Sequence, residues 1–115
     1  MRLFAQSSLG IDTGVVELFS EFEGGGSMWT GQGPRARSQD VVFSRPFQNA
    51  PVIQLGVLLW DVDTSVNFRA HTLAEDIRPD GFRLELRTWG DSRIARVQIG
   101  WTAFGPVADD SDWTL

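Results

Sequence analysis

The sequence predicts an all-β fold in which 115 residues form a single sandwich domain. Several short stretches alternate apolar and polar residues, and this period of two is typical of strands with one buried face. Turn-forming residues, among them 12 Gly and 5 Pro, separate the stretches. No stretch has the apolar spacing of a helix. A chain of this length buries one core, so we expect about five or six strands in one β-sandwich.

The expected strands follow one another from residue 15 to residue 101. We predict them at residues 15–22, 41–47, 52–60, 66–72, 82–89 and 92–101. A glycine-rich break at residues 24–27, followed by an irregular run to Arg37, separates the first two. The core of the domain is expected within residues 14–105, with arms at residues 1–13 and 106–115.

Residues 52–60 form the most hydrophobic of these stretches. Both faces of the expected strand carry apolar side chains, for example Leu55 on one face and Leu58 and Trp60 on the other. A strand of this kind is normally covered on both sides. The second cover is either the N-terminal segment or another subunit.

Two turns are expected near the C-terminal half of the chain. Residues 78–81 read Arg-Pro-Asp-Gly, in which Pro presets the first corner and Gly accepts a positive φ. Gly90-Asp91 is a two-residue hairpin signal that would join residues 82–89 to residues 92–101 in one sheet. In that register Glu85 faces Arg96, a favourable cross-strand pair of charges.

The composition argues against several classes of protein. The formal net charge is −5 and the arginines are scattered, so nucleic acid is not an expected partner. The chain has no cysteine, which excludes disulfides and thiolate metal sites. No apolar run reaches the length of a signal peptide or of a membrane span. We therefore expect a soluble protein, either cytoplasmic or exported by a non-classical route.

No catalytic motif is complete. Asp61-Val62-Asp63 begins like a calcium loop, but Val66 and Thr72 stand where such a loop needs Gly and Glu. His71 is the only histidine, and no nucleophile motif accompanies it. The remaining catalytic alternative is a glycoside hydrolase with Asp61 and Asp63 as its carboxylate pair, which we regard as weak. We expect no metal, no cofactor and no enzymatic activity.

Trp89 is the residue that the strand pattern does not explain. It lies on the face of residues 82–89 that otherwise carries charged side chains. The polar face of residues 66–72 carries Asn67, Arg69 and His71. An indole plate beside hydrogen-bonding groups suits a sugar, which stacks its C–H groups on the ring. The alternative is that Trp89 packs under a loop while Arg69 pairs with Glu75 or Asp76, and the residues alone leave both open.

Seven short segments follow one another in an order and spacing that resemble the H-type lectin domain family, which includes a snail agglutinin and the C-terminal domain of discoidin. The segments are Phe43-Ser44-Arg45-Pro46-Phe47, Ala50-Pro51-Val52-Ile53, Leu59-Trp60-Asp61, Asn67-Phe68-Arg69, Asp80-Gly81-Phe82, Thr88-Trp89-Gly90-Asp91-Ser92 and Trp101-Thr102-Ala103. Met28-Trp29-Thr30-Gly31 is similar to bacterial members of the family.

The resemblance implies a six-stranded antiparallel sandwich that assembles as a trimer. It implies that sugars of the galactose and N-acetylgalactosamine type, carried on glycans or glycoconjugates, bind between neighbouring protomers, in a role such as cell adhesion. Asn67, Arg69 and Trp89 match sugar-binding positions of the family, and Gly90 and Asp91 follow that Trp.

Three positions depart from the snail protein's pattern. Gln32 aligns near an acidic sugar ligand, and Gly90 and Ala95 replace a His and a Tyr. The cysteine that links subunits is absent, which excludes a disulfide-linked hexamer and leaves a trimer or a hexamer stacked by non-covalent contacts.

Overall fold

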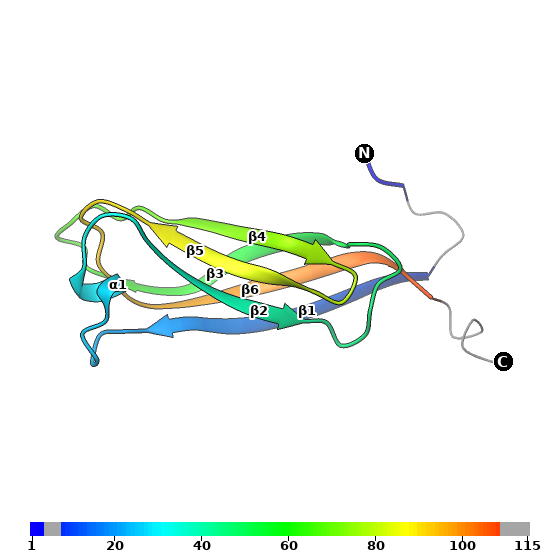
Figure 1. Cartoon of the computed structure of the whole chain (residues 1–115), viewed down its shortest axis with the longest axis horizontal. Helices are drawn as coiled ribbons and strands as arrows, with labels where there is room; N and C mark the ends of the chain where they lie inside the picture. The colour runs from blue at the N-terminus through cyan, green and yellow to red at the C-terminus, as the bar shows by residue number, and fades with distance from the viewer. Residues whose placement is uncertain (4–7, 109–115) are drawn as a thin grey trace.

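The computed structural model describes residues 1–3 and 8–108, and there the chain folds as two packed β-sheets (Figure 1). The elements in order are β1 Ser8–Ser20, α1 Ser27–Thr30, β2 Arg35–Val42, β3 Val52–Val62, β4 His71–Arg78, β5 Gly81–Thr88 and β6 Ile94–Val107. Sheet A has the order β1-β6-β3 and sheet B the order β2-β5-β4. All neighbouring strands are antiparallel. The predicted six-stranded sandwich is confirmed.

Apolar side chains from both sheets meet between the layers. Phe82, Leu84 and Leu86 of β5 are fully buried, and alternate residues of β6 from Val97 onward are buried as well. The rings of Phe82 and Trp101 meet edge to face with their centroids 5.7 Å apart. Burying large apolar side chains is the main favourable contribution to such a fold. The alternating residues of both strands that were expected in the core do lie there.

The predicted hairpin between residues 82–89 and 92–101 is wrong. β5 lies in sheet B and β6 in sheet A, so the chain crosses between the layers at residues 89–93. Glu85 instead bonds Arg87 of its own strand, and Arg96 pairs with Glu17 of β1 at 2.9 Å. The physical reason is that each strand has a strongly apolar side. The two apolar sides can pack against each other when the strands lie in opposite sheets, but not when they lie next to each other in one sheet.

Several strand boundaries also differ from the prediction. β2 covers Arg35–Val42 rather than residues 41–47, because arginines occupy its inward-facing positions and hide the alternation. The strand expected at residues 66–72 is a loop up to Ala70, and β4 begins at His71. Phe68 of that loop packs on Trp60 at 5.7 Å between ring centroids, outside the core. β1 and β6 extend into the segments expected as arms. The turn at residues 78–81 is confirmed, because Arg78 pairs with Gly81.

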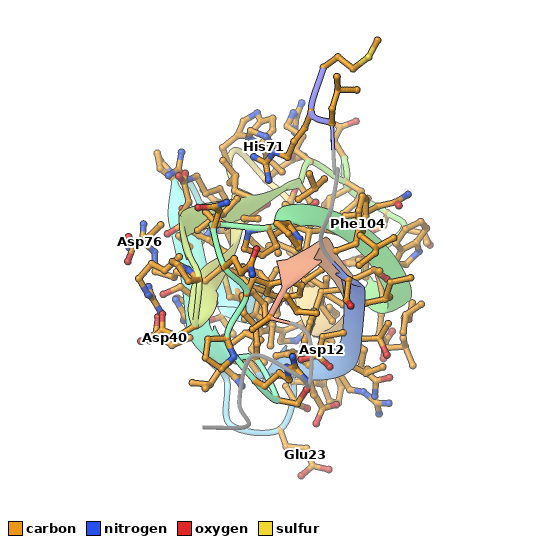
Figure 2. The ribbon with its side chains drawn as sticks, turned by 90° about the vertical axis from the view of Figure 1, so that its right-hand side faces the viewer. Asp12, Glu23, Asp40, His71, Asp76 and Phe104 are labelled. Atoms are coloured by element: carbon orange, nitrogen blue, oxygen red, sulfur yellow. The ribbon has the colours of Figure 1, made fainter. Side chains whose placement is uncertain are left out.

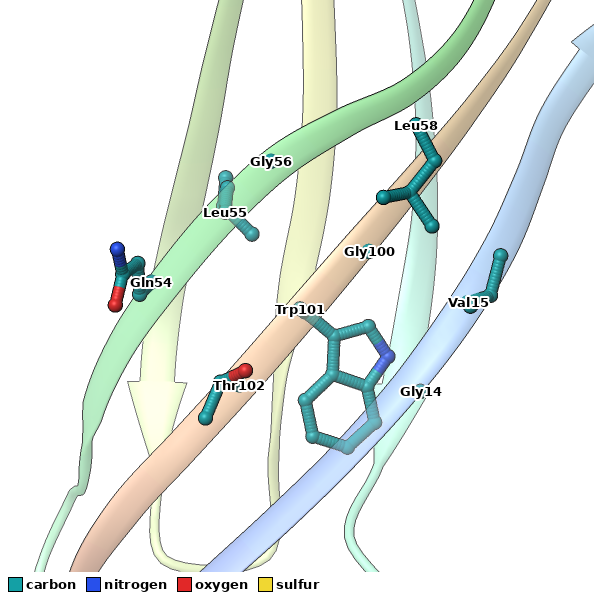
Figure 3. Close-up of a pocket in the computed structure, with 9 residues that line it drawn as sticks. All are labelled: Gly14, Val15, Gln54, Leu55, Gly56, Leu58, Gly100, Trp101 and Thr102. Atoms are coloured by element: carbon teal, nitrogen blue, oxygen red, sulfur yellow. The ribbon is translucent and has the colours of Figure 1, made fainter.

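The outer face of sheet A carries several exposed apolar side chains. Ile11 and Val15 of β1 are 67% and 62% exposed, and Leu58 of β3 is 61% exposed. Gly100 of β6 lies between Val15 of β1 and Gly56 of β3, so two paired positions of this face carry no side chain (Figure 3). Leu58 lies across this glycine-lined depression. The strand that was expected to be covered on both sides is therefore an edge strand with an open outer face.

The outer face of sheet B is charged. Arg87 of β5 pairs with Glu85 on the same strand and with Glu75 of β4. Figure 2 views the sandwich along its long axis, with Asp40 and Asp76 projecting on the side of sheet B. The two outer faces therefore differ in character. Within the described residues, no helix has the length and apolar content needed to cross a membrane.

Candidate functional site

Most of the residues singled out in the sequence gather at one end of the sandwich, here called the α1 end. It consists of helix α1 and the loops at residues 31–34, 63–70 and 89–93 (Figure 1). The first residue of β1 and the last residue of β6 lie at the opposite end. The α1 end is thus built entirely from connections between strands, where binding residues are commonly placed by a rigid scaffold.

Asp91 is the centre of the polar cluster at this end. Its Oδ1 accepts a hydrogen bond from Arg69 Nη1 at 2.6 Å, and its Oδ2 accepts one from Asn67 Nδ2 at 3.5 Å. The sequence placed Asn67 and Arg69 on one strand, and the structure brings them together from a loop instead. The partner of Arg69 is Asp91, not Glu75 or Asp76 as the alternative had it.

Two buried hydroxyl groups hold the loop of Arg69 in place. Ser92 Oγ accepts the backbone N–H of Arg69 at 2.7 Å and donates to the carbonyl of Asn67 at 2.7 Å. Thr88 Oγ1 donates to the carbonyl of Arg69 at 2.5 Å. Both hydroxyl-bearing residues are almost fully buried. Buried polar groups that are fully paired specify one conformation, so the Arg69 side chain starts from a fixed backbone.

Trp89 is the first residue after β5 and is 45% exposed. Gly90 follows with a φ of 70°, a conformation in which a side chain is strained. A Cβ at Gly90 would lie 3.1 Å from Arg69 Nη1, so the guanidinium packs directly on this glycine. The turn therefore brings the Arg69 guanidinium onto the residue that follows Trp89 in the chain.

The loop of Gln32 reaches the same place. The N–H of Gly33 donates to the carbonyl of Gly90 at 2.9 Å, which joins the two loops directly, and Gln32 is exposed beside this bond. His71 differs, because it begins β4 opposite Arg87 on the outer face of sheet B. Ala95 is buried and offers no group to a ligand. Of the named positions, His71 and Ala95 thus lie outside the cluster.

The electrostatics of the cluster keep Asp91 ionised. The hydrogen bond from Arg69 is the largest cause that lowers the pKa of the Asp91 carboxyl below its ordinary value. A carboxylate that is already paired in this way is a hydrogen-bond acceptor and not an acid at neutral pH. The cluster can therefore offer acceptors from Asp91 and the donors of Asn67 and Arg69 that Asp91 does not use.

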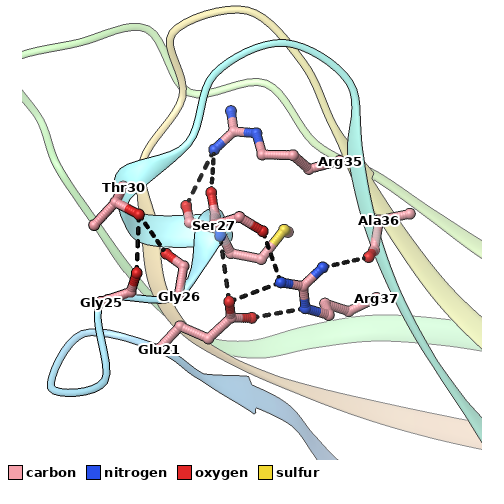
Figure 4. Close-up of polar contacts among 9 residues, drawn as sticks. Glu21, Gly25, Gly26, Ser27, Thr30, Arg35, Ala36 and Arg37 are labelled. Atoms are coloured by element: carbon pink, nitrogen blue, oxygen red, sulfur yellow. Dashed lines mark hydrogen bonds and ion pairs between the residues drawn. The ribbon is translucent and has the colours of Figure 1, made fainter.

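A second polar network, which was not predicted from the sequence, joins α1 to β2 and to Glu21 (Figure 4). Arg37 of β2 donates to both carboxylate oxygens of Glu21 at 2.8 Å and to Ser27 Oγ at 2.8 Å. Arg35 donates to the carbonyls of Ser27 and Met28 of α1. Arginines two residues apart fall on one face of a strand, and this spacing is the signal that would have found them.

Asp63 is arranged for structure rather than for acid catalysis. It accepts bonds from the N–H and hydroxyl of Ser65 at 2.9 and 2.6 Å, and from Arg93 Nη1 at 3.2 Å. The Ser65 hydroxyl is the largest cause that lowers the pKa of Asp63. The general acid of a glycosidase needs a raised pKa. The Cζ of Arg93 also lies 4.6 Å from the centroid of the Trp29 ring, so Arg93 links Asp63 to α1.

Within residues 1–3 and 8–108, no group of three or more His, Asp or Glu side chains could hold a metal ion.

The chain is similar to proteins of one family in sequence and in fold. A family model described as the H-type lectin domain matches residues 38–104. A protein of Fuscovulum blasticum named "ATP synthase subunits region ORF 7" is 47% identical over 109 residues, which cover 95% of each chain, and its name states no activity.

Two solved structures of discoidin II from Dictyostelium discoideum have the same fold. Both match with a TM-score of 0.76, at 22% and 23% identity, over 92% and 91% of this chain. This chain spans 40% of the length of discoidin II. At such low identity the likeness establishes the fold alone.

Proposed function

The chain belongs to the H-type lectin domain family, and from that membership we propose that it binds carbohydrate without catalysis. The proposed ligand is a terminal sugar of the galactose or N-acetylgalactosamine type, and the proposed site is the Asn67, Arg69 and Trp89 cluster with Gly90, Asp91 and Gln32. The single observation that carries the proposal is that Trp89 is exposed and is followed by Gly90, on which the guanidinium of the Arg69–Asp91 pair packs.

The chemistry of this cluster suits a sugar. One face of a pyranose ring presents C–H groups, which pack on an aromatic plate such as Trp89. The hydroxyl groups of the other edges need donors and acceptors at fixed positions, and Arg69 and Asp91 supply one of each kind. The backbone bonds through Ser92 hold Arg69 before any ligand arrives, which reduces the entropy lost on binding.

Each site is expected to bind weakly, and we propose that a homotrimer compensates by avidity. Gly90 provides no side chain, and Ala95 is buried, so two positions that carry rings in the snail protein contribute nothing here. Several identical sites on one assembly raise the apparent affinity for a surface that displays many copies of the sugar. The exposed apolar face of sheet A, with Ile11, Val15 and Leu58, supports the assembly.

The second candidate is an assembly module of the same fold that no longer binds sugar. Its support is that Asp91 already engages both Arg69 and Asn67 within the chain. A glycan array on the wild-type protein separates the two. Binding to galactose-type glycans supports the lectin, and no binding to any glycan supports the module. Turnover of a chromogenic glycoside would revive the hydrolase with Asp61 and Asp63.

Calorimetric titration with N-acetylgalactosamine tests the site itself. Trp89→Ala removes the stacking plate and Arg69→Ala removes the donors, so each should weaken binding about 5- to 150-fold, or roughly 1–3 kcal/mol. Arg78→Ala is the matched control, because its side chain is 36% exposed against 37% for Arg69 and is likewise paired with aspartate. Equal affinity in all three variants would place the site elsewhere.

A further inference from the structure

Arg35 makes more hydrogen bonds to the α1 end than its place in the sequence suggests. Its Nε donates to the carbonyl of Gly33 at 3.0 Å. Its Nη1 donates to the carbonyls of Ser27 and Met28 at 2.9 and 3.4 Å. Its Nη2 donates to the carbonyls of Ser92 and Gly90 at 2.8 and 3.4 Å. All five acceptors are main-chain carbonyl oxygens.

These acceptors belong to three separate segments. Residues 27–28 lie in α1, Gly33 lies in the loop that carries Gln32, and residues 90–92 lie in the loop that carries Trp89 and Asp91. Arg35 is the first residue of β2 and lies opposite Thr88, the last residue of β5. Figure 4 shows its side chain reaching from the start of β2 toward Ser27 of α1.

The shape of the guanidinium explains why an arginine stands here. Its planar fork presents donors in fixed, divergent directions, whereas a lysine presents a single nitrogen. The site carries a cost, because partial burial and the nearby charge of Arg37 both lower the pKa of Arg35. The acceptors of Arg35 are neutral carbonyl groups and not carboxylates. Its role is therefore to position the main chain, not to pair with an opposite charge.

We propose that Arg35 is a positioning residue of the candidate site, which locks the loop of Gln32 to the loop of Trp89. This inference rests on the proposed function for its consequence, although the lock itself does not depend on a ligand. Arg35 donates to the carbonyls of both Gly33 and Gly90. It therefore stabilises the direct hydrogen bond from the Gly33 N–H to the Gly90 carbonyl.

The lock extends one step further through Ser92. The carbonyl of Ser92 accepts from Arg35, while its Oγ accepts the N–H of Arg69 and donates to the carbonyl of Asn67. A shift of the 90–92 loop would therefore move the backbone that presents Arg69. In this way one side chain positions the loops of Gln32 and Trp89 directly and the loop of Arg69 through Ser92.

Amide hydrogen exchange of the unliganded protein tests the lock. In Arg35→Met we expect the Gly33 amide to exchange at least about tenfold faster, because its acceptor loop is released. Buried amides of β5 and β6 should keep their wild-type rates. Arg87→Met is the control, since Arg87 bonds only carboxylates on the outer face of sheet B among its described contacts. An unchanged Gly33 rate, or equal acceleration of every amide, would overturn the proposal.

Arg35→Lys distinguishes the fork from the charge and guards against misfolding of the methionine variant. A lysine keeps the charge but cannot reach Gly33, Ser27 and Ser92 at once, so Gly33 should again exchange faster. A wild-type rate in Arg35→Lys would contradict the positioning role.

Titration with N-acetylgalactosamine adds the functional consequence. Both Arg35 variants should bind about five- to tenfold more weakly than the wild type, with unchanged association state. If the wild type binds no sugar, the proposed function is wrong. The exchange rate of the Gly33 amide in the Arg35 variants still shows whether Arg35 holds the two loops together. If the wild type binds and both variants bind equally well, the lock has no role in the site.

Discussion

The Arg69–Asp91 pair determines which groups a ligand meets at the proposed site. Arg69 Nη1 lies 2.6 Å from Asp91 Oδ1, and the other nitrogens of the guanidinium remain as donors for a ligand. The pair is more than one-third exposed on both sides, so its contribution to folding is small. Its role is to orient Arg69, which is a matter of geometry rather than of stability.

Removing the guanidinium should raise the pKa of Asp91. In the wild type the hydrogen bond from Arg69 lowers that pKa below 3.8, so the contact is complete above this value and is lost as the pH falls through the lowered pKa. In Arg69→Met the carboxyl should titrate at a higher pH, which carboxyl-carbon NMR measures directly. Arg78→Met should leave Asp91 unchanged. Identical titration of Asp91 in the wild type and in Arg69→Met would refute the pairing.

Gly90→Ala should disturb the same place without removing any hydrogen-bonding group. The substitution forces a φ of 70° on a residue with a Cβ, which would also lie 3.1 Å from Arg69 Nη1. We expect a loss of about 1–2 kcal/mol in the free energy of unfolding. Gly24→Ala is the control, because nothing lies within 4 Å of a Cβ there. Equal denaturation midpoints for the two variants would argue against the strain.

The sequence predicted which residues belong to this cluster, but not the hydrogen bonds that hold them together. Trp89 stood out because it left the apolar phase of its strand, Asn67 and Arg69 stood out on a polar strand face, and the family resemblance matched all three to sugar-binding positions. The bonds that assemble them run through Ser92 and Asp91, more than twenty residues away along the chain. Such bonds depend on how two loops pack, and no local pattern encodes that packing.

Individual strands follow from the alternation of apolar side chains, but their partners do not. Residues 82–89 and 92–101 each show an apolar face, and both contain real strands, β5 and β6. The Gly90-Asp91 signal suggested a hairpin, yet the two strands pack face to face in different sheets. A turn signal reports the local backbone, whereas the burial of Phe82 against Trp101 decides the sheet.

Phe82→Ala tests this face-to-face packing of the two sheets. Phe82 is fully buried and contacts the rings of Phe43 and Trp101. Its loss should lower the free energy of unfolding by about 3–5 kcal/mol, measured by chemical denaturation. The control is Arg83→Ala. The side chain of the neighbouring Arg83 points away from the core, so its removal should change the free energy of unfolding by less than about 0.5 kcal/mol. A small effect for Phe82→Ala would mean that the two sheets do not share this core.

The whole molecule has two outer faces of opposite character. Sheet B presents paired charges such as Arg87 with Glu75 and Glu85, while sheet A presents Ile11, Val15 and Leu58 to solvent. An apolar face of this kind is typical of a surface that another subunit covers. It lies along the body of the sandwich rather than on the loops of the α1 end.

Leu58→Asp should convert the proposed trimer into a folded monomer. Leu58 is 61% exposed in the single chain, so an aspartate there is tolerated by the fold but would bury an unpaired charge in an interface. Sedimentation velocity measures the state directly. Ser38→Asp, on the exposed outer side of β2 in sheet B, should leave the trimer intact. A wild-type protein that sediments as a monomer would contradict the assembly.

The most direct test of carbohydrate binding at the α1 end is an amide chemical-shift map of the wild-type protein titrated with N-acetylgalactosamine. We predict shift changes at residues 67–69 and 89–92, which form the Asn67, Arg69 and Asp91 cluster with Trp89. The turn at residues 78–81, at the other end of the sandwich, should not respond. An unperturbed spectrum at millimolar sugar, or changes confined to the turn at residues 78–81, would contradict the account.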